Sequence, residues 1–178
     1  MAYLAGHPGE GHFMLCAIDP SVTDEDDPVS CDPDLDLYAE ANGFVEPPDE
    51  PRYTTRFVET YRAAQRARVE RIDELARGLV TRRHDARDRW GNGGTVEDRR
   101  QMIATDFIRV YRTDADPRSV DRSLDPSERD YGSIWGVRPD FINYGAVGFG
   151  RVVSPEAWLS TWSGLSSRAE IADTGSRM

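Results

Sequence analysis

The chain has 178 residues, of which 38% are hydrophobic and 30% charged, and its formal net charge is −10 at pH 7. This length suits one domain or one domain with an appended subdomain, and the polar composition is typical of a protein with a large surface and long loops. An acidic surface repels the phosphates of nucleic acids, so we expect no nucleic-acid partner.

The N-terminal part of the sequence predicts short elements followed by a long loop. Residues 2–5 are an apolar run that could form a strand, and the glycine-rich segment 6–12 predicts a turn. Residues 13–18 are apolar and predict the start of a short helix. Proline steps interrupt residues 19–52, and spaced apolar residues there indicate a loop that packs on a surface. The acidic block at 24–27 is expected to be solvated.

The strongest pattern in the sequence spans residues 55–89. Side chains of one face recur there at steps of three and four residues, which is the period of an amphipathic helix. The positions on this face are Phe57, Tyr61, Ala64, Arg68, Ile72, Leu75 and Leu79. Thr54 or Thr55 can cap the N-terminus of this helix, and the glycine-rich cluster at 90–94 ends it. A helix of this length is about 50 Å long, at 1.5 Å per residue.

Shorter elements follow the long helix. Residues 95–98 have the pattern of a capping box that opens a short helix, and residues 106–112 are rich in β-branched and aromatic side chains, which predicts a strand. Residues 114–140 are expected to be irregular. Ser154 followed by Pro155 predicts the start of another helix. The predicted fold class is mainly α with a few short strands (α+β) and long irregular loops.

Cysteine content and hydropathy indicate the cellular compartment of the protein. The two cysteines, Cys16 and Cys31, are too few for a disulfide framework, and we expect both to be free thiols. The N-terminus lacks the basic and apolar regions of a signal peptide, and no stretch approaches the ~18 apolar residues of a membrane span. We therefore expect a cytoplasmic protein without membrane association.

Candidate chemistry in the sequence is sparse. No Gly-x-Ser-x-Gly elbow, phosphate-binding loop or zinc-binding helix motif occurs, and Ser133 lies in a different context, Tyr-Gly-Ser-Ile-Trp. His7, Glu10 and His12 are two imidazoles and a carboxylate within six residues, which could bind a metal or relay a proton. A tight turn splays its side chains and no further ligand is identifiable. We therefore expect no metal and no cofactor, and these three residues are substrate-facing candidates or parts of a plain turn.

Several segments occur in a definite order along the chain. They are residues 7–11, 18–28, 34–38, 41–44, 61–68, 112–118, 124–129, 143–145 and 158–163. In this order and spacing they resemble a poorly characterised group of bacterial α/β-hydrolase-like proteins that contain a cap. The resemblance covers most of the chain.

The resemblance implies a domain organisation and a parent activity. Residues 1–18 would form the end of a core strand, a glycine turn and a short helix, residues 19–165 would form the cap over the active site, and residues 166–178 would be a truncated tail. The nucleophile elbow would precede this sequence, and the acid and the histidine of the triad would follow it. None of the family's catalytic residues can therefore be assigned here, and the parent activity would be hydrolysis of esters or acyl groups.

Three functions follow as hypotheses. The first is the cap region of an ester- or acyl-cleaving hydrolase that is inactive alone and works with a chain that carries the core. The second is an acidic helical module without catalysis, which binds a protein partner or a second copy of itself through the long helix. The third is a self-contained enzyme that uses His7, Glu10 and His12, with or without a metal.

Overall fold

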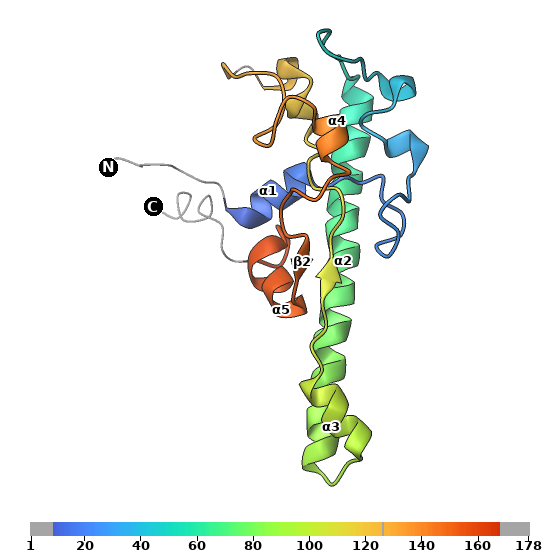
Figure 1. Cartoon of the computed structure of the whole chain (residues 1–178), viewed down its shortest axis with the longest axis vertical. Helices are drawn as coiled ribbons and strands as arrows, with labels where there is room; N and C mark the ends of the chain where they lie inside the picture. The colour runs from blue at the N-terminus through green and yellow to red at the C-terminus, as the bar shows by residue number, and fades with distance from the viewer. Residues whose placement is uncertain (1–8, 126, 168–178) are drawn as a thin grey trace, which may run out of the picture.

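The computed structural model of the chain describes residues 9–125 and 127–167. Its longest element, the helix α2 (Thr55–Gly91), runs along the long axis of the molecule, and most other segments pack around its N-terminal and middle parts (Figure 1). The strand predicted at residues 2–5 lies outside the described residues. Within the described residues, no helix is both long and apolar enough to cross a bilayer.

The described residues are mainly helical, as the sequence predicts, and their single sheet is a short antiparallel pair. Besides α2, the α-helical segments are α1 (Glu10–Ala17), α3 (Val96–Ile103), α4 (Pro139–Ile142) and α5 (Pro155–Ala157), which continues as a π-helical turn (Trp158–Trp162). The 3₁₀ turns are Pro33–Leu35, Glu40–Asn42, Pro117–Ser119 and Arg122–Leu124. The strands are β1 (Ile108–Arg109) and β2 (Val152–Val153).

Side-chain capping determines where the helices α2 and α3 begin. The Thr54 hydroxyl oxygen accepts a hydrogen bond from the Phe57 N–H at 3.1 Å, so α2 begins where the sequence predicts. A capping box opens α3, since the Thr95 hydroxyl oxygen accepts from the Asp98 N–H and the Asp98 carboxylate accepts from the Thr95 N–H. The turn between the two helices places α3 beside the end of α2 (Figure 1).

Two elements differ from their predicted extents. The strand predicted over 106–112 shortens to the two residues of β1, because in this stretch only Ile108 and Arg109 pair in strand register, with Val153 and Val152 of β2. The Val110 N–H still donates to the Arg151 carbonyl oxygen at 2.9 Å. Of the glycine-rich turn predicted over 6–12, residues 6–8 lie outside the described residues, and residues 10–12 belong instead to α1, which begins at Glu10.

The buried face of α2 includes Tyr61, Arg68 and Ile72, as the sequence predicts, but it departs from the prediction at Leu75. Leu75 is 44% exposed, whereas the polar residues Gln65 and Asp73 are buried. The reason is that both polar side chains find hydrogen-bond partners on the segments that cover the helix. The prediction that Leu75 faces the core is therefore wrong.

Two hydrophobic clusters lie along this face of α2. One surrounds Trp158 and contains Met14, Ile18, Val69, Ile72, Ala76, Ile108 and Val110. The other surrounds Tyr61 and contains Leu37, Phe44, Tyr53, Ala115 and Val120. The loops and short helices therefore use α2 as a common surface against which to bury their apolar side chains.

Buried polar side chains of α2 hold the N-terminal loop between these clusters. The Gln65 side-chain amide donates to the carbonyl oxygens of Cys16 and Ile18 at 2.7 and 2.8 Å. Arg68, which is fully buried, donates to the Asp19 carbonyl oxygen at 2.6 Å and to both carboxylate oxygens of Glu25 at 2.9 and 2.6 Å. The expectation of a wholly solvated acidic block is therefore wrong for Glu25, which is the counter-ion of a buried arginine.

Trp158 joins the C-terminal segment to α2 in the same way. Its side chain is fully buried, and its indole N–H donates to the Asp73 carboxylate at 2.7 Å. The Ser154 hydroxyl oxygen accepts from the Ala157 N–H, which is the N-cap that the sequence predicts for this helix. The aromatic ring of Trp158 is thus buried among apolar side chains, and its indole N–H has a hydrogen-bond acceptor.

We predict that replacing Arg68 by methionine strongly destabilises the protein. The Arg68→Met change leaves the buried Asp19 carbonyl and one side of Glu25 without a donor, so the free energy of unfolding should fall by about 3 kcal/mol. The matched control is Arg66→Met on the same helix, because the Arg66 side chain is 62% exposed and pairs with Glu70 at the surface. Its effect should stay within about 0.5 kcal/mol. Urea denaturation measures both, and equal losses would contradict the anchoring role of Arg68.

Candidate functional site

A pocket of about 250 Å³ opens between α1, residues 114–119 and residues 129–134. One wall is apolar and consists of Phe13, Ile134 and Phe149, of which the two phenylalanine rings stack with centroids 5.5 Å apart. The rest of the lining is mainly polar and includes Asp114, Asp116, Arg118, Arg129 and Ser133. An apolar wall that faces a few convergent polar groups is the common form of a small-molecule site.

Asp114 and Ser133 form the central polar pair of this pocket. The Ser133 hydroxyl donates to the Asp114 carboxylate at 2.8 Å. Burial raises the pKa of Asp114 to about 6, although the Ser133 hydrogen bond and the charge of Arg151 favour the ionised form. Asp114 therefore gains and loses a proton near neutral pH, which suits a group that exchanges protons with a ligand.

A second carboxyl group in the same pocket behaves in the opposite way. Burial alone would favour neutral Asp116, but its hydrogen bonds to Arg118 and the charges of Arg62 and Arg118 outweigh this effect and lower the pKa of Asp116. Asp116 is therefore a fixed anion that orients Arg118. Arg129 donates to the Arg118 carbonyl oxygen at 2.5 Å, and its buried Nε has no hydrogen-bond partner among residues 9–125 and 127–167.

The backbone of Asp114 is fixed from two sides. Its N–H donates to the side-chain oxygen of Asn143 at 3.1 Å, and its carbonyl oxygen accepts from the Tyr38 hydroxyl at 2.5 Å. Asn143 also donates through its side-chain nitrogen to the Asp19 carboxylate at 2.7 Å. These contacts come from three separate segments, so the position of Asp114 depends on the packed loops rather than on a regular element.

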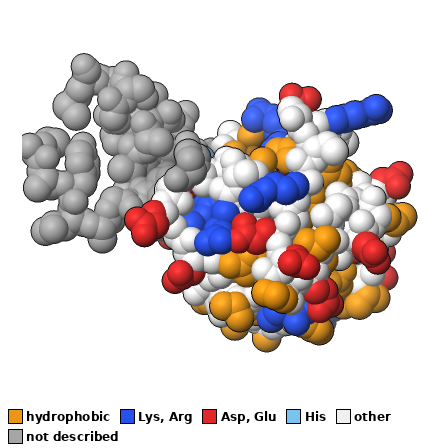
Figure 2. All heavy atoms as spheres, turned by 90° about the horizontal axis from the view of Figure 1, so that it is seen from above, with side chains coloured by type: hydrophobic (Ala, Val, Ile, Leu, Met, Phe, Trp, Pro, Cys, Tyr) orange, Lys and Arg blue, Asp and Glu red, His pale blue; other side chains and the backbone are white. Residues whose placement is uncertain are grey.

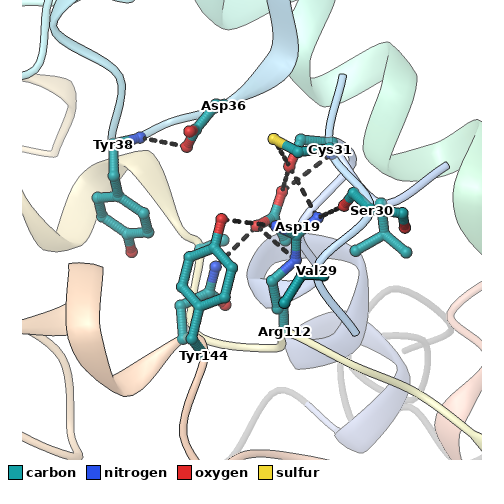
Figure 3. A network of polar contacts seen from close by, with 12 residues as sticks. Asp19, Val29, Ser30, Cys31, Asp36, Tyr38, Arg112 and Tyr144 are labelled. Carbon is teal, nitrogen blue, oxygen red and sulfur yellow. Dashed lines mark hydrogen bonds and ion pairs between the residues drawn. The ribbon is translucent and has the colours of Figure 1, made fainter. Parts of the chain in front are cut away.

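Arg112, two residues before Asp114, belongs to a network of polar contacts with Asp19, Ser30 and Tyr144, as Figure 3 shows. The Arg112 side chain is 1% exposed, and its guanidinium donates to the Tyr144 hydroxyl at 2.7 Å and to the Ser30 carbonyl oxygen at 2.5 Å. Its Nε lies 3.5 Å from the Asp19 carboxylate. The backbone of Arg112 has a φ of 51°, a left-handed conformation that non-glycine residues seldom adopt. Such an outlier persists because the network holds it, and it turns the chain just before Asp114.

The residues predicted as candidates occupy a different place. Glu10 is in the first turn of α1, and His12 is exposed on the same helix, with its Nε2 3.7 Å from the Cys16 sulfur. His7 lies outside the described residues. Burial raises the pKa of Cys16, so its thiol is protonated at neutral pH and is not an activated nucleophile. In the described part of the chain, no three histidine, cysteine or carboxylate side chains group in a way that could hold a metal ion.

Sequence reasoning did not identify Asp114, Asp116 and Ser133 as site residues. These residues lie in a stretch that is predicted to be irregular, and no motif marks their spacing. The only signal is indirect, because aspartate, arginine and glycine are dense at 112–118 and 129–133, and irregular segments often carry functional side chains.

Comparisons with protein-family models, with curated proteins and with solved structures find no match to this chain. A functional proposal therefore depends on the geometry of the site itself.

We predict that the Asp114 carboxyl makes stability depend on pH. The folded protein binds the Asp114 proton more tightly than the unfolded chain, with a pKa of about 6 against 3.8. The stabilisation from this proton is complete below about pH 4 and is lost as the pH rises to about 6. The Asp114→Asn variant should lack this loss, which is about 2–3 kcal/mol, because each tenfold difference in proton affinity corresponds to about 1.4 kcal/mol.

Denaturant unfolding at pH 4, 5, 6 and 7 measures this dependence. The control is Asp130→Asn, at an exposed aspartate that does not line the pocket, whose profile should follow that of the wild type. If the Asp114→Asn profile also follows the wild type, the Asp114 carboxyl is not protonated in the way that its burial indicates.

Proposed function

We propose that the chain is the substrate-binding cap region of an ester- or acyl-cleaving hydrolase. The observation that carries the proposal is the pocket whose lining combines apolar side chains with the hydrogen-bonded Asp114–Ser133 pair. An ester combines an apolar chain with oxygen atoms that accept hydrogen bonds, and this pocket offers a partner for each part. The acyl chain would lie against Phe13 and Phe149, and the ester oxygens would face Ser133.

The size of the pocket favours a short acyl group. Its volume of about 250 Å³ is smaller than that of sites for drug-sized ligands, which begin at roughly 300 Å³. Hydrolysis of an ester by a serine mechanism also needs a nucleophile, a base and oxyanion donors in one geometry. In our proposal a partner polypeptide provides them, while the Ser133 hydroxyl exchanges its hydrogen bond to Asp114 for one to an ester oxygen of the substrate.

A second function, a protein-interaction module without catalysis, is favoured by exposed apolar side chains in one segment. Between residues 134 and 152, seven large apolar side chains are 41–74% exposed: Ile134, Trp135, Val137, Phe141, Tyr144, Val147 and Val152. Surface apolar groups of this kind often mark interaction sites. Figure 2 shows hydrophobic side chains interspersed with arginine and carboxylate groups on one face of the molecule.

For both functions, the surface that we propose for partner binding is not the long helix that the sequence hypothesis named. The middle of α2 buries its apolar face beneath the loops, and the face that remains is charged, as at Arg66 and Glu70. We therefore propose the segment 134–152, rather than the long helix, as the surface for a partner.

We predict that a neutral short-chain ester binds the isolated chain. The Trp135 ring lies 5.6 Å from the ring of Phe149, which lines the pocket, so ethyl butyrate should change the Trp135 fluorescence in a saturable way. The Ser133→Ala variant should bind the ester about tenfold more weakly, since one hydrogen bond to a buried partner is lost. Ser160→Ala, at an exposed serine outside the pocket, is the matched control. Equal affinities of the two variants would contradict a role for Ser133 in binding.

We further predict that the isolated chain does not hydrolyse esters. A short-chain p-nitrophenyl ester should show no turnover above the buffer rate, and a fluorophosphonate probe should label no serine. Turnover with labelling of Ser133 would replace the cap proposal by a self-contained hydrolase. Absence of any ester binding in the fluorescence titration would leave the protein-interaction module as the better proposal.

A further inference from the structure

A second cavity, of about 430 Å³, is lined by residues next to those of the first pocket on the same two segments. Residues 109–112 and 151–152 line the second cavity, whereas Asp114 and Phe149 line the first. Tyr144 and Pro28 complete part of its wall. Because the two cavities share these segments but no lining residue, we treat the second as a separate site.

The second cavity gathers positive charge in a chain of net charge −10. Its lining includes three arginines, Arg109, Arg112 and Arg151, and no carboxylate. We propose that this cavity binds a small molecule in which a carboxylate or phosphate group is attached to an apolar or aromatic body. This proposal does not depend on the function proposed for the first pocket.

The carboxylates around the cavity leave one cation unmatched. Arg112 is balanced by Asp19, which is itself 1% exposed. Arg109 pairs with Asp26 at 2.6 Å, but the Asp26 side chain is 86% exposed, so a ligand can displace this contact without uncovering a buried charge. Arg151 has no ion pair with any residue of the described ranges, and its buried Nε has no hydrogen-bond partner there.

Arg151 is held in this unmatched state by the fold. Burial lowers the pKa of Arg151, and only the charge of Asp114 opposes this effect. Its guanidinium donates to the Val147 carbonyl oxygen. Gly148, with a φ of 141°, leaves the space that the guanidinium fills, since a Cβ there would lie 2.7 Å from Arg151 Nε. A half-buried cation that has no ion pair, and only the charge of Asp114 from the first pocket to offset its desolvation, is unfavourable. An anionic ligand in contact with Arg151 would reduce this penalty.

The rest of the lining suits the body of such a ligand. Tyr111 and Tyr144 present aromatic rings, and Pro28, Ala146 and Val152 are apolar. The Tyr144 ring lies 4.8 Å from the Arg112 guanidinium and its hydroxyl accepts from the same group, so this ring is fixed in place. Benzoate and phenyl phosphate combine an anionic group with an aromatic ring and are therefore suitable probes, and benzamide is the neutral counterpart of benzoate.

The first experiment is an NMR titration of the full chain that follows the arginine Nε–H signals. The Arg151 signal is assigned by its loss in Arg151→Lys. We expect saturable shifts of the Arg151 and Arg109 signals with benzoate, phenyl phosphate or both, and no saturable shift with benzamide. Which anion binds more tightly distinguishes a carboxylate ligand from a phosphate ligand. Saturation by neither anion, or equal binding of benzamide, would overturn the proposal, and neither result requires a variant that folds.

The second experiment compares two variants, each of which removes one positive charge, at different sites. Arg151→Met should weaken binding of the better anion by about tenfold or more, because a charge-assisted hydrogen bond is lost. Arg100→Met on α3, where the Arg100 side chain is 74% exposed, should bind as the wild type does. Melting temperatures confirm that both variants are folded. Wild-type affinity in a folded Arg151→Met variant would show that the anion binds elsewhere and would overturn the assignment to this cavity.

Discussion

The whole arrangement depends on polar side chains of one helix that satisfy the backbone of the loops packed against it. A sheet would pair the backbone groups of neighbouring segments, but the described segments around α2 are mostly irregular and need other donors. Gln65, Arg62, Arg68 and Arg71 provide them by donating to the carbonyl oxygens of Cys16, Ile18, Asp19 and Val22. These contacts lie between the two hydrophobic clusters, so a loop that left α2 would uncover apolar surface and buried polar groups together. Burial of Arg68 is tolerated because Glu25 and a carbonyl oxygen satisfy it at the same time.

The same use of side chains in place of regular structure positions both cavities. Residues 108–114 have only a two-residue strand, yet Arg112, Asn143 and Tyr38 fix the chain on either side of Asp114. All 22 basic residues are arginine. A planar guanidinium can reach a carboxylate and a carbonyl oxygen at once, which the single ammonium of lysine does less well. Arginine content therefore matters to this fold beyond its charge.

Sequence reasoning succeeded where the signal is local. The 3.6-residue period and the Thr54 cap predicted α2, and the Thr95–Asp98 pattern predicted α3, because helix formation depends on neighbours within one or two turns. It failed where the partner is distant. Burial of Asp73 rather than Leu75 depends on Trp158, which lies 85 residues further along the chain. The candidate pocket also depends on distant partners. Asp114, Ser133 and Phe149 come together only when the irregular segments pack, and no periodicity or motif in the sequence predicts this.

The far end of α2 behaves differently from its middle. From Arg89 to Ile103 the chain is a helical hairpin whose contacts include the Arg89–Asp98 ion pair at 2.6 Å and the Arg99 guanidinium 5.9 Å from the Trp90 ring. Two of its apolar side chains, Val96 and Ile103, are more than 60% exposed. Amide hydrogens in this hairpin can therefore exchange with solvent by local opening, while those around Arg68 exchange only when the loops detach from the helix. One continuous helix thus contains two units of cooperative unfolding.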